Sequence, residues 1–401
     1  MAGYYDFTSF QKYTIGYGTL RDIRRITYGM GDRYLILHDY HCNGAINERI
    51  REGLENPKAL PIEVTADNMV GREAGLMDSL PGDDEMTPAE FQFCQVENKV
   101  CSLQAAEEIG KTICDYQPDI VVAVGGARCQ DLVRAALHYT DRYKRPKLVM
   151  CPTVLSSNAS ATGMSVMYDE ETGEMADFWS LAYMPECQIV DTEVLIDTPV
   201  RALIAGIGDQ VASSVEALHT IKKIGEWERC DPLCISHHEA VLRVLKEHAP
   251  AAVQAMEEKK VTKEFEWVCH ALTRFTGPQL AIQTAFFAHI LDEALIMIPE
   301  LKGKMHGELV GYGILPEMVL FGTPEEIPAW VDFLEEIGIP VNLKELGIET
   351  YDYETIKSYC EAASDKIMAS RAIVHWSAEE MAHAIMAADA MVNAYLEKKP
   401  L

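Results

Sequence analysis

The sequence predicts an α/β N-terminal domain followed by an all-α C-terminal domain. In residues 1–195, short apolar runs alternate with helical stretches, which is typical of a parallel sheet covered on both faces. In residues 196–401 these runs disappear and long segments of helical periodicity take over. A chain of 401 residues is long enough for two domains of ordinary size.

Four apolar runs are predicted to form the buried strands of the first domain. They are RYLILHDYH at 33–41, DIVVAVGG at 119–126, KLVMCPT at 147–153 and CQIVDT at 187–192. The acidic segment at about 69–91 is rich in Gly and Pro and is predicted to be a surface excursion. In the second domain, helical periodicity predicts long helices at 202–223, 279–298 and 377–399.

Composition excludes several classes of partner. A net charge of −27 opposes binding to nucleic acid or to an anionic membrane surface, because both require clustered Lys and Arg. No uncharged apolar run approaches the roughly 18 residues of a membrane span, and the start of the chain does not resemble a signal peptide. An odd number of cysteines, eleven, scattered through a large chain fits reduced thiols. We therefore expect a soluble, cytoplasmic protein.

The run VVAVGGARCQDLVRAAL joins a buried strand to a helix through Gly125 and Gly126. Glycines at such a joint let the backbone approach a phosphate closely, and the amides at the helix start bind anions. Asp39, at the end of the first strand, can accept hydrogen bonds from a ribose and would repel a 2′-phosphate, which favours NAD over NADP. A tight strand-to-helix turn and an ordinary surface carboxylate are the structural alternatives.

Three polar side chains stand in otherwise apolar segments of the second domain. They are Asp209 in LIAGIGDQVASS, His289 in QLAIQTAFFAHILDEAL and His306 at the head of an apolar run. A buried carboxylate needs a cation or metal, whereas a single buried histidine is more often a hydrogen-bonded core residue. Together, one carboxylate and two imidazoles from three helices form a plausible ligand set for a catalytic metal with an open position.

Motifs along the chain carry a resemblance to a known family. They are GYG at 16–18, VGGARCQD at 124–131, CPTVLSSNASATGMSVMY at 151–168, AGIGDQVASSVEA at 205–217, AH at 288–289, MHGELVGYG at 305–313 and GIPVNLKELGI at 338–348. In this order they resemble the glycerol dehydrogenase branch of the iron-containing alcohol dehydrogenase superfamily. The resemblance covers nearly the whole chain.

This resemblance implies a dehydroquinate synthase-like fold and an NAD-dependent, metal-dependent oxidoreductase acting on a small polyol or related secondary alcohol or ketone. It implies Asp209, His289 and His306 as metal ligands, with zinc the first choice and iron or manganese acceptable. We also expect a homo-oligomer. The positions that fall on the family's cofactor contacts are Asp39, Gly126, Asp131, Thr153, Ser156, Thr162, Met164 and Tyr168, and Gly125 belongs to the same turn.

The sequence departs from the family pattern at two places. Ala127 and Arg128 replace a third turn glycine and a lysine, so a Cβ enters the phosphate turn while the positive charge is kept. Asn158 replaces the aspartate that contacts substrate in the family, which exchanges a charged acceptor for an amide. Glycerol is therefore not the expected substrate.

Several alternatives stay open from the sequence. CDPLCISHH at 230–238 is either a zinc knuckle built from Cys230, Cys234, His237 and His238, or a loop connecting helices, which we favour. An enzyme of the glycerol-1-phosphate dehydrogenase type or a cyclising dehydroquinate synthase-like enzyme would share the fold. The dehydrogenase-type Asp209 and the absence of a Lys/Arg cluster for a substrate phosphate argue against both. The departures at Ala127 and Asn158 also allow a catalytically silent binding homologue.

Overall fold

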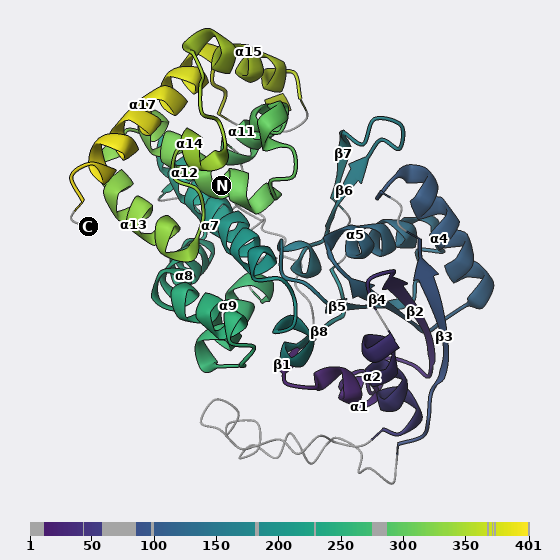
Figure 1. The fold of residues 1–401 in the computed structure, drawn as a ribbon. Coiled ribbons are helices and arrows are strands. Elements are labelled where there is room, and N and C mark those ends of the chain that lie inside the picture. Colours follow the sequence, from purple (N-terminus) through teal and green to yellow (C-terminus); the bar gives the residue numbers. More distant parts are fainter. Residues whose placement is uncertain are drawn as a thin grey trace. The chain divides into compact units, whose positions relative to one another are not determined.

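The protein divides into two compact units (Figure 1). The α/β unit comprises Thr8–Val154 and Ala159–Thr198, and the helical unit comprises Leu155–Asn158 and Pro199–Leu401. The short Leu155–Asn158 segment therefore belongs to the helical unit although its neighbours in sequence belong to the other. The computed structural model describes residues 12–42, 44–57, 86–97, 100–180, 184–227, 230–274, 287–366, 369, 370, 372 and 374–399.

A six-stranded parallel sheet forms the centre of the α/β unit, in the order β1-β8-β5-β4-β2-β3. The four predicted strands are the four inner ones, and every residue of β4 is buried. Burial of strands on both faces is typical of parallel sheets, which explains their uninterrupted apolar runs. The strands are β1 (Lys12–Gly16), β2 (Arg33–Asp39), β3 (Glu90–Val96), β4 (Ile120–Gly125), β5 (Lys147–Pro152) and β8 (Cys187–Asp191).

Three features were not predicted from the sequence: the two edge strands and a separate antiparallel hairpin of β6 (Met164–Tyr168) and β7 (Met175–Ser180). An edge strand has one neighbour and partial exposure, so it lacks the continuous apolar signal of an inner strand. β3 begins at Glu90 and therefore includes the end of the segment predicted as an excursion at 69–91. Residues 69–85 of that segment lie outside the described residues.

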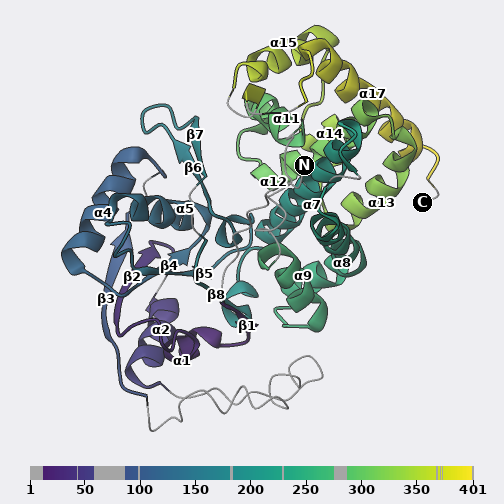
Figure 2. The same ribbon diagram turned by 180° about the vertical axis from the view of Figure 1, so that it is seen from behind.

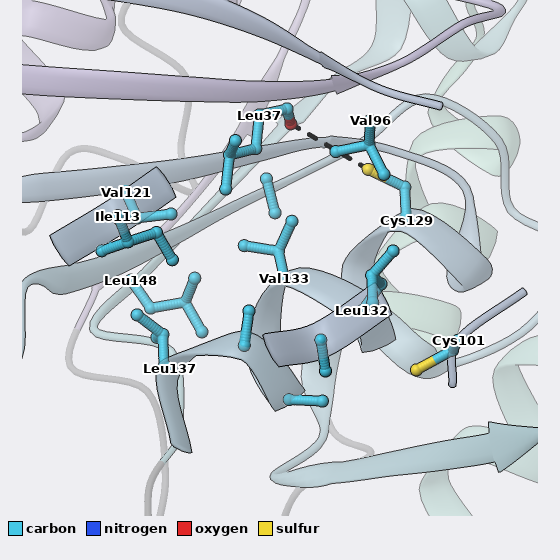
Figure 3. Close-up of a cluster of buried hydrophobic side chains, with 14 of the residues drawn as sticks. Leu37, Val96, Cys101, Ile113, Val121, Cys129, Leu132, Val133, Leu137 and Leu148 are labelled. Atoms are coloured by element: carbon cyan, nitrogen blue, oxygen red, sulfur yellow. Dashed lines mark hydrogen bonds between the residues drawn. The ribbon is translucent and has the colours of Figure 1, made fainter. Parts of the chain in front are cut away.

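Helices cover both faces of the sheet (Figure 1 and Figure 2). Successive side chains of a strand point to opposite faces, so Leu35 and Leu37 of β2 pack with α4 (Leu103–Tyr116) and α5 (Ala127–Ala136). Figure 3 shows this cluster around Leu132 and Val133. On the other face, Tyr34 and Ile36 pack with η1, α1 and α2. The remaining elements of this unit are η1 (Thr19–Asp22), α1 (Ile23–Ile26), α2 (Gly44–Glu55), η4 (Leu137–Tyr139), η5 (Ala159–Ala161) and α6 (Thr192–Leu195).

The helical unit contains the predicted long helices. The segment 202–223 lies within α7, and 377–399 contains α17, which Ser377 begins with a reciprocal capping box to Glu380. Of the segment 279–298, α11 forms the described part from Phe287, and residues 279–286 lie outside the described residues. The elements are α7 (Val200–Lys223), α8 (Pro232–Glu257), α9 (Lys263–Thr273), α11 (Phe287–Leu295), η7 (Pro299–Leu301), α12 (His306–Phe321), η8 (Pro324–Glu326), α13 (Ile327–Ile337), α14 (Leu343–Leu346), α15 (Tyr353–Ser364) and α17 (Ala378–Leu396).

The segment 230–238 corrects one prediction. It is mostly the first turns of α8 and not a connecting loop, because Asp231 caps the helix through Leu233 and a proline follows at its first position. Within the described part of the chain, its cysteines and histidines do not meet as a metal-binding group. All eleven cysteines are described and are free thiols. No helix among the described residues is long and apolar enough to cross a membrane.

Candidate functional site

Three helices of the helical unit bring Asp209, His289 and His306 together. Asp209 lies on α7, His289 on α11, and His306 is the first residue of α12. Their side chains are 5%, 12% and 44% exposed, respectively, so the group is accessible from the His306 side. Within the described residues, this is the group of histidines, cysteines and carboxylates whose donor atoms lie close enough to hold a metal ion.

Glycines allow α7 and α12 to approach until their backbones touch. A Cβ on Gly307 would lie 1.7 Å from the carbonyl oxygen of Ala205, and one on Gly208 would lie 2.1 Å from the carbonyl oxygen of Gly307. No side chain fits at either position. These glycines are direct neighbours in sequence of Asp209 and His306, so the close approach of the helices is also what brings these two donors together.

The start of α12 is fixed by Glu308. Its carboxylate accepts a hydrogen bond from the backbone N–H of Met305 at 2.7 Å, which satisfies an amide that the helix leaves unpaired. The same carboxylate forms a two-bond ion pair with Arg201 of α7, at 2.7 and 2.6 Å. The HGE motif thus contains a metal-site histidine, a packing glycine and a residue that anchors the helix start.

The distances between the donor atoms fit a metal ion. One oxygen of Asp209, Oδ1, lies 3.5 Å from Nε2 of His289 and 3.8 Å from Nε2 of His306. All three donor atoms lie within 4.8 Å of one another. Zinc binds such atoms at about 2.0–2.2 Å, so donors around a tetrahedral ion lie roughly 3.4 Å apart. The observed spacing matches a three-ligand site.

Each donor has a further hydrogen-bond partner. Nδ1 of His289 lies 2.7 Å from Oε2 of Glu216, and Nδ1 of His306 lies 2.8 Å from Oδ2 of Asp292. The backbone N–H of Asn158 donates to Asp209. Glu216 and Asp292 were not predicted from the sequence. Each lies in an apolar segment that also carries a candidate donor: Glu216 follows Asp209, and Asp292 follows His289. A further carboxylate in such a segment was the feature that could have identified them.

Charge at this site favours a cation. Burial by itself raises the pKa of Asp209, but the two imidazoles and the Asn158 N–H outweigh it and lower that pKa below its usual value. Burial lowers the pKa of His289, but Glu216 and Asp209 raise it well above normal. The pKa of His306 is likewise raised, by Asp292 and Asp209 against burial. The carboxylates around the imidazoles therefore stabilise positive charge, whether a proton or a metal ion supplies it.

In the α/β unit, Asp39 and the glycine turn lie together at a topological switch point. The chain leaves β2 toward β3 on one side and leaves β4 toward β5 on the other. Ligands of open parallel sheets bind outside the carboxyl ends of the strands at such a point. Asp39 ends β2 and Gly125 ends β4, so the two lie side by side here. A Cβ on Gly125 would come within 2.8 Å of the Cβ of Asp39.

The start of α5 has the features of an anion site. Gly126 is its N-cap residue in an extended conformation and has no side chain to satisfy the first amides. A Cβ at Gly126 would lie 3.1 Å from Val154, so a larger residue would crowd the turn. Ala127 is the first residue of the helix, and the Arg128 side chain is exposed. The described residues therefore fit a pyrophosphate at this helix start.

The other residues predicted to contact a cofactor lie in different settings. Asp131 is buried and pairs with Arg134 at 2.7 Å, and burial raises its pKa to about 6. Its second oxygen accepts the N–H of Val166, so it joins α5 to the β6–β7 hairpin. Thr162 accepts a hydrogen bond from the Met164 N–H just before β6. Tyr168 ends β6, Thr153 donates its N–H to Gly125, and Ser156, like Asn158, belongs to the helical unit.

Comparisons with known proteins identify related sequences. The family model described as iron-containing alcohol dehydrogenase matches residues 58–192. A glycolaldehyde reductase of Halobacterium salinarum is 31% identical over 264 residues, 65% of this chain and 71% of that protein. A glycerol dehydrogenase of Thermotoga maritima is 29% identical over 271 residues, 66% of this chain and 72% of that protein.

Solved structures show the same fold. The structure of a probable glycerol dehydrogenase from Sinorhizobium meliloti matches with a TM-score of 0.77 at 22% identity, covering 97% of this chain and 99% of that one. Glycerol dehydrogenase from Schizosaccharomyces pombe matches with a TM-score of 0.78 at 21% identity, covering 99% and 93%. The prediction of an α/β unit followed by a helical unit of this fold type is thereby confirmed.

Proposed function

Because the chain belongs to the iron-containing alcohol dehydrogenase family, in its glycerol dehydrogenase branch, we propose that it transfers hydride between NAD and a small polyol or hydroxy-carbonyl compound at a divalent metal. The observation that carries this proposal is the convergence of Asp209, His289 and His306 at metal-ligand spacing. The three-donor set is typical of catalytic sites, because it leaves a position for substrate.

Separate groups of residues would bind the metal ion and the dinucleotide. Asp209, His289 and His306 would hold the ion, and Asp39, Gly125 and Gly126 would hold the dinucleotide at the switch point. When bound, the metal supplies Lewis acidity that eases loss of the substrate hydroxyl proton, and NAD supplies the hydride acceptor. The protein supplies orientation and charge stabilisation. The His306 side chain is 44% exposed, so the substrate would approach the donors from the side of His306.

Zinc is our first choice of ion, since one carboxylate and two imidazoles suit it, but iron and manganese accept the same ligands. NAD is proposed over NADP because the carboxylate of Asp39 would repel a 2′-phosphate. A homo-oligomer and a cytoplasmic location remain predictions.

The test is alcohol oxidation by metal-stripped and reloaded protein. We expect chelator-treated protein to lose turnover and Zn²⁺, Fe²⁺ or Mn²⁺ to restore it, with a higher kcat/KM for NAD than for NADP. The measurement is NADH formation across glycerol, 1,2-propanediol, hydroxy acids and, in reverse, hydroxyaldehydes and hydroxyketones. A protein that binds Zn²⁺ and NADH but turns over none of these compounds would instead indicate a silent binding homologue.

Asn158 is proposed to contact the substrate and to contribute to substrate specificity. Its backbone N–H donates to Asp209, which places the residue directly beside a metal donor. An amide both donates and accepts, so it tolerates a carbonyl or carboxylate on the substrate where an aspartate would not. The glycolaldehyde reductase relative is named for such a hydroxy-carbonyl compound.

We expect Asn158→Asp to shift the ratio of kcat/KM for glycerol over a hydroxy acid by roughly tenfold to a hundredfold toward glycerol. The added charge gives a substrate hydroxyl a stronger acceptor and repels a carboxylate, effects worth on the order of 1–3 kcal/mol. Asn56→Asp, at an exposed position of the α/β unit, is the matched control. An unchanged ratio in Asn158→Asp would show that this position does not contact the substrate.

A further inference from the structure

Two of the three helices that carry the proposed metal donors also carry a carboxylate that binds the donor histidine of another helix. Glu216 lies on α7 two turns after Asp209, and it binds His289 of α11. Asp292 lies on α11 three residues after His289, and it binds His306 of α12. Residues at these spacings share one face of a helix, so each carboxylate points to the same side as the donor on its own helix.

These contacts decide which imidazole nitrogen faces the metal site. A carboxylate oxygen accepts a hydrogen bond, so when each imidazole is neutral its hydrogen is on Nδ1 and its lone pair is on Nε2, where a metal ion would bind. Both Nε2 atoms face Oδ1 of Asp209, at 3.5 and 3.8 Å. An imidazole without such a partner is free to present the other tautomer or to rotate its ring.

We propose that Glu216 and Asp292 are positioning residues of the metal centre, and that Glu216 has the larger effect. This inference rests on the proposed function, because it assumes that the ion binds at Asp209, His289 and His306. The two carboxylates touch the donors and not the ion, so they act by fixing the orientation and raising the basicity of the imidazoles.

Glu216 is the stronger of the two for three reasons. Its side chain is fully buried, whereas that of Asp292 is 12% exposed. It accepts two hydrogen bonds from His289, one from Nδ1 at 2.7 Å and one from the backbone N–H at 3.1 Å, so it fixes both ring and backbone. Among the described residues, Asp292 contacts His306 through a single hydrogen bond, and the His306 side chain is 44% exposed, so water weakens that contact more.

A second buried glutamate provides a matched control. Glu317 of α12 has a fully buried side chain, and it contacts Nδ1 of His219 at 2.8 Å. His219 is not one of the three donors and stacks on Phe321 at 5.1 Å between ring centroids. Glu317→Gln therefore replaces a second buried glutamate of the same helical unit, one whose hydrogen-bond partner is not a donor although the charges of Glu216 and His289 act on its carboxyl.

The experiment measures metal binding and not turnover. Metal-stripped full-length protein is titrated with Zn²⁺ against a chromophoric chelator, and with Co²⁺ while the visible absorption bands are recorded. We expect Glu216→Gln to weaken Zn²⁺ binding by about 10- to 100-fold and to alter the Co²⁺ bands, since loss of such a partner typically has this effect. The Zn²⁺ affinity of Asp292→Asn should lie between those of Glu216→Gln and wild type. The Zn²⁺ affinity of Glu317→Gln should stay within about threefold of wild type, with unaltered Co²⁺ bands.

The outcomes separate the two proposals. Wild-type Zn²⁺ affinity and Co²⁺ bands in both Glu216→Gln and Asp292→Asn would overturn the positioning role. An equal loss in Glu317→Gln would also overturn it, because a buried carboxyl that binds no donor histidine would then have the same effect. Unchanged binding in Asp209→Ala would instead refute the metal site of the proposed function. If Glu216→Gln does not fold by circular dichroism, Asp292→Asn, at a partly exposed residue, decides the question.

Discussion

Asp209→Ala is expected to bind Zn²⁺ far more weakly than wild type and to lose turnover. The substitution removes the charged ligand and leaves two imidazoles, which hold a divalent ion poorly. The loss of affinity should exceed the roughly 10- to 100-fold typical for an outer hydrogen-bond partner. With the Lewis acid absent, kcat/KM should fall by on the order of 10³ or more, about 4 kcal/mol of transition-state stabilisation. His306→Ala should behave in the same way.

The measurements are metal stoichiometry by elemental analysis and kcat/KM for NAD reduction. The fold should persist, because alanine is a strong helix former and Asp209 lies in the interior of the long helix α7, and circular dichroism checks this. Asp115→Ala, at an exposed position of α4, is the control and should retain metal and activity. Full metal content in Asp209→Ala would place the ion elsewhere, and the Cys230–His238 segment at the start of α8 would be examined first.

Gly307→Ala is expected to be among the most damaging single-methyl substitutions in the helical unit. The new Cβ would lie 1.7 Å from the Ala205 carbonyl oxygen, and 2.4 Å from its carbon, so backbone and not a flexible side chain must move. Overpacking of a close contact typically destabilises by about 1–3 kcal/mol, and a backbone clash of this size should reach the upper end or exceed it. Separation of α7 from α12 would also move His306 away from Asp209.

Thermal unfolding and Zn²⁺ titration of the same protein test both effects. The matched control is Gly44→Ala, which adds the same methyl group to α2 where no atom lies within 4 Å. In a helix this change should be neutral or stabilising. If Gly307→Ala unfolds at the wild-type temperature and binds Zn²⁺ normally, the two helices tolerate a wider spacing and the contact does not position the donors.

The sequence predicted those parts of the protein whose signals are local. The inner strands β2, β4, β5 and β8 are buried on both faces, so their apolar runs are continuous. The helices α7 and α17 are long enough for their periodicity to be unambiguous. The three proposed metal donors were identified because polar residues in apolar helices are few, and because the motifs around them resemble a family.

The features that were not predicted from the sequence depend on contacts between residues that are far apart in the chain. β1 and β3 are sheet edges with mixed composition. β3 alternates polar and apolar residues, as a half-exposed strand does, but it lacks the continuous apolar run from which the inner strands were predicted. Glu216 and Asp292 resemble ordinary helical carboxylates until α11 and α12 are placed beside them. The segment 230–238 contains two cysteines and two histidines close together in sequence, yet most of it is helical. Asp231 caps this helix and Pro232 begins it. Capping residues were the better guide there than metal-ligand spacing.

The location of all three metal donors within the helical unit has a consequence for how that unit is held together. A bound ion would tie α7 to α11 and α12, across a long loop of chain that includes α8 and α9. Because the ion would bind the folded helices and not the unfolded chain, its binding would add about 4 kcal/mol of stability at a free concentration 1,000 times Kd. The ion would therefore stabilise the fold of the helical unit in addition to its role in the reaction. Its loss would lower the stability of this unit, which contains no sheet.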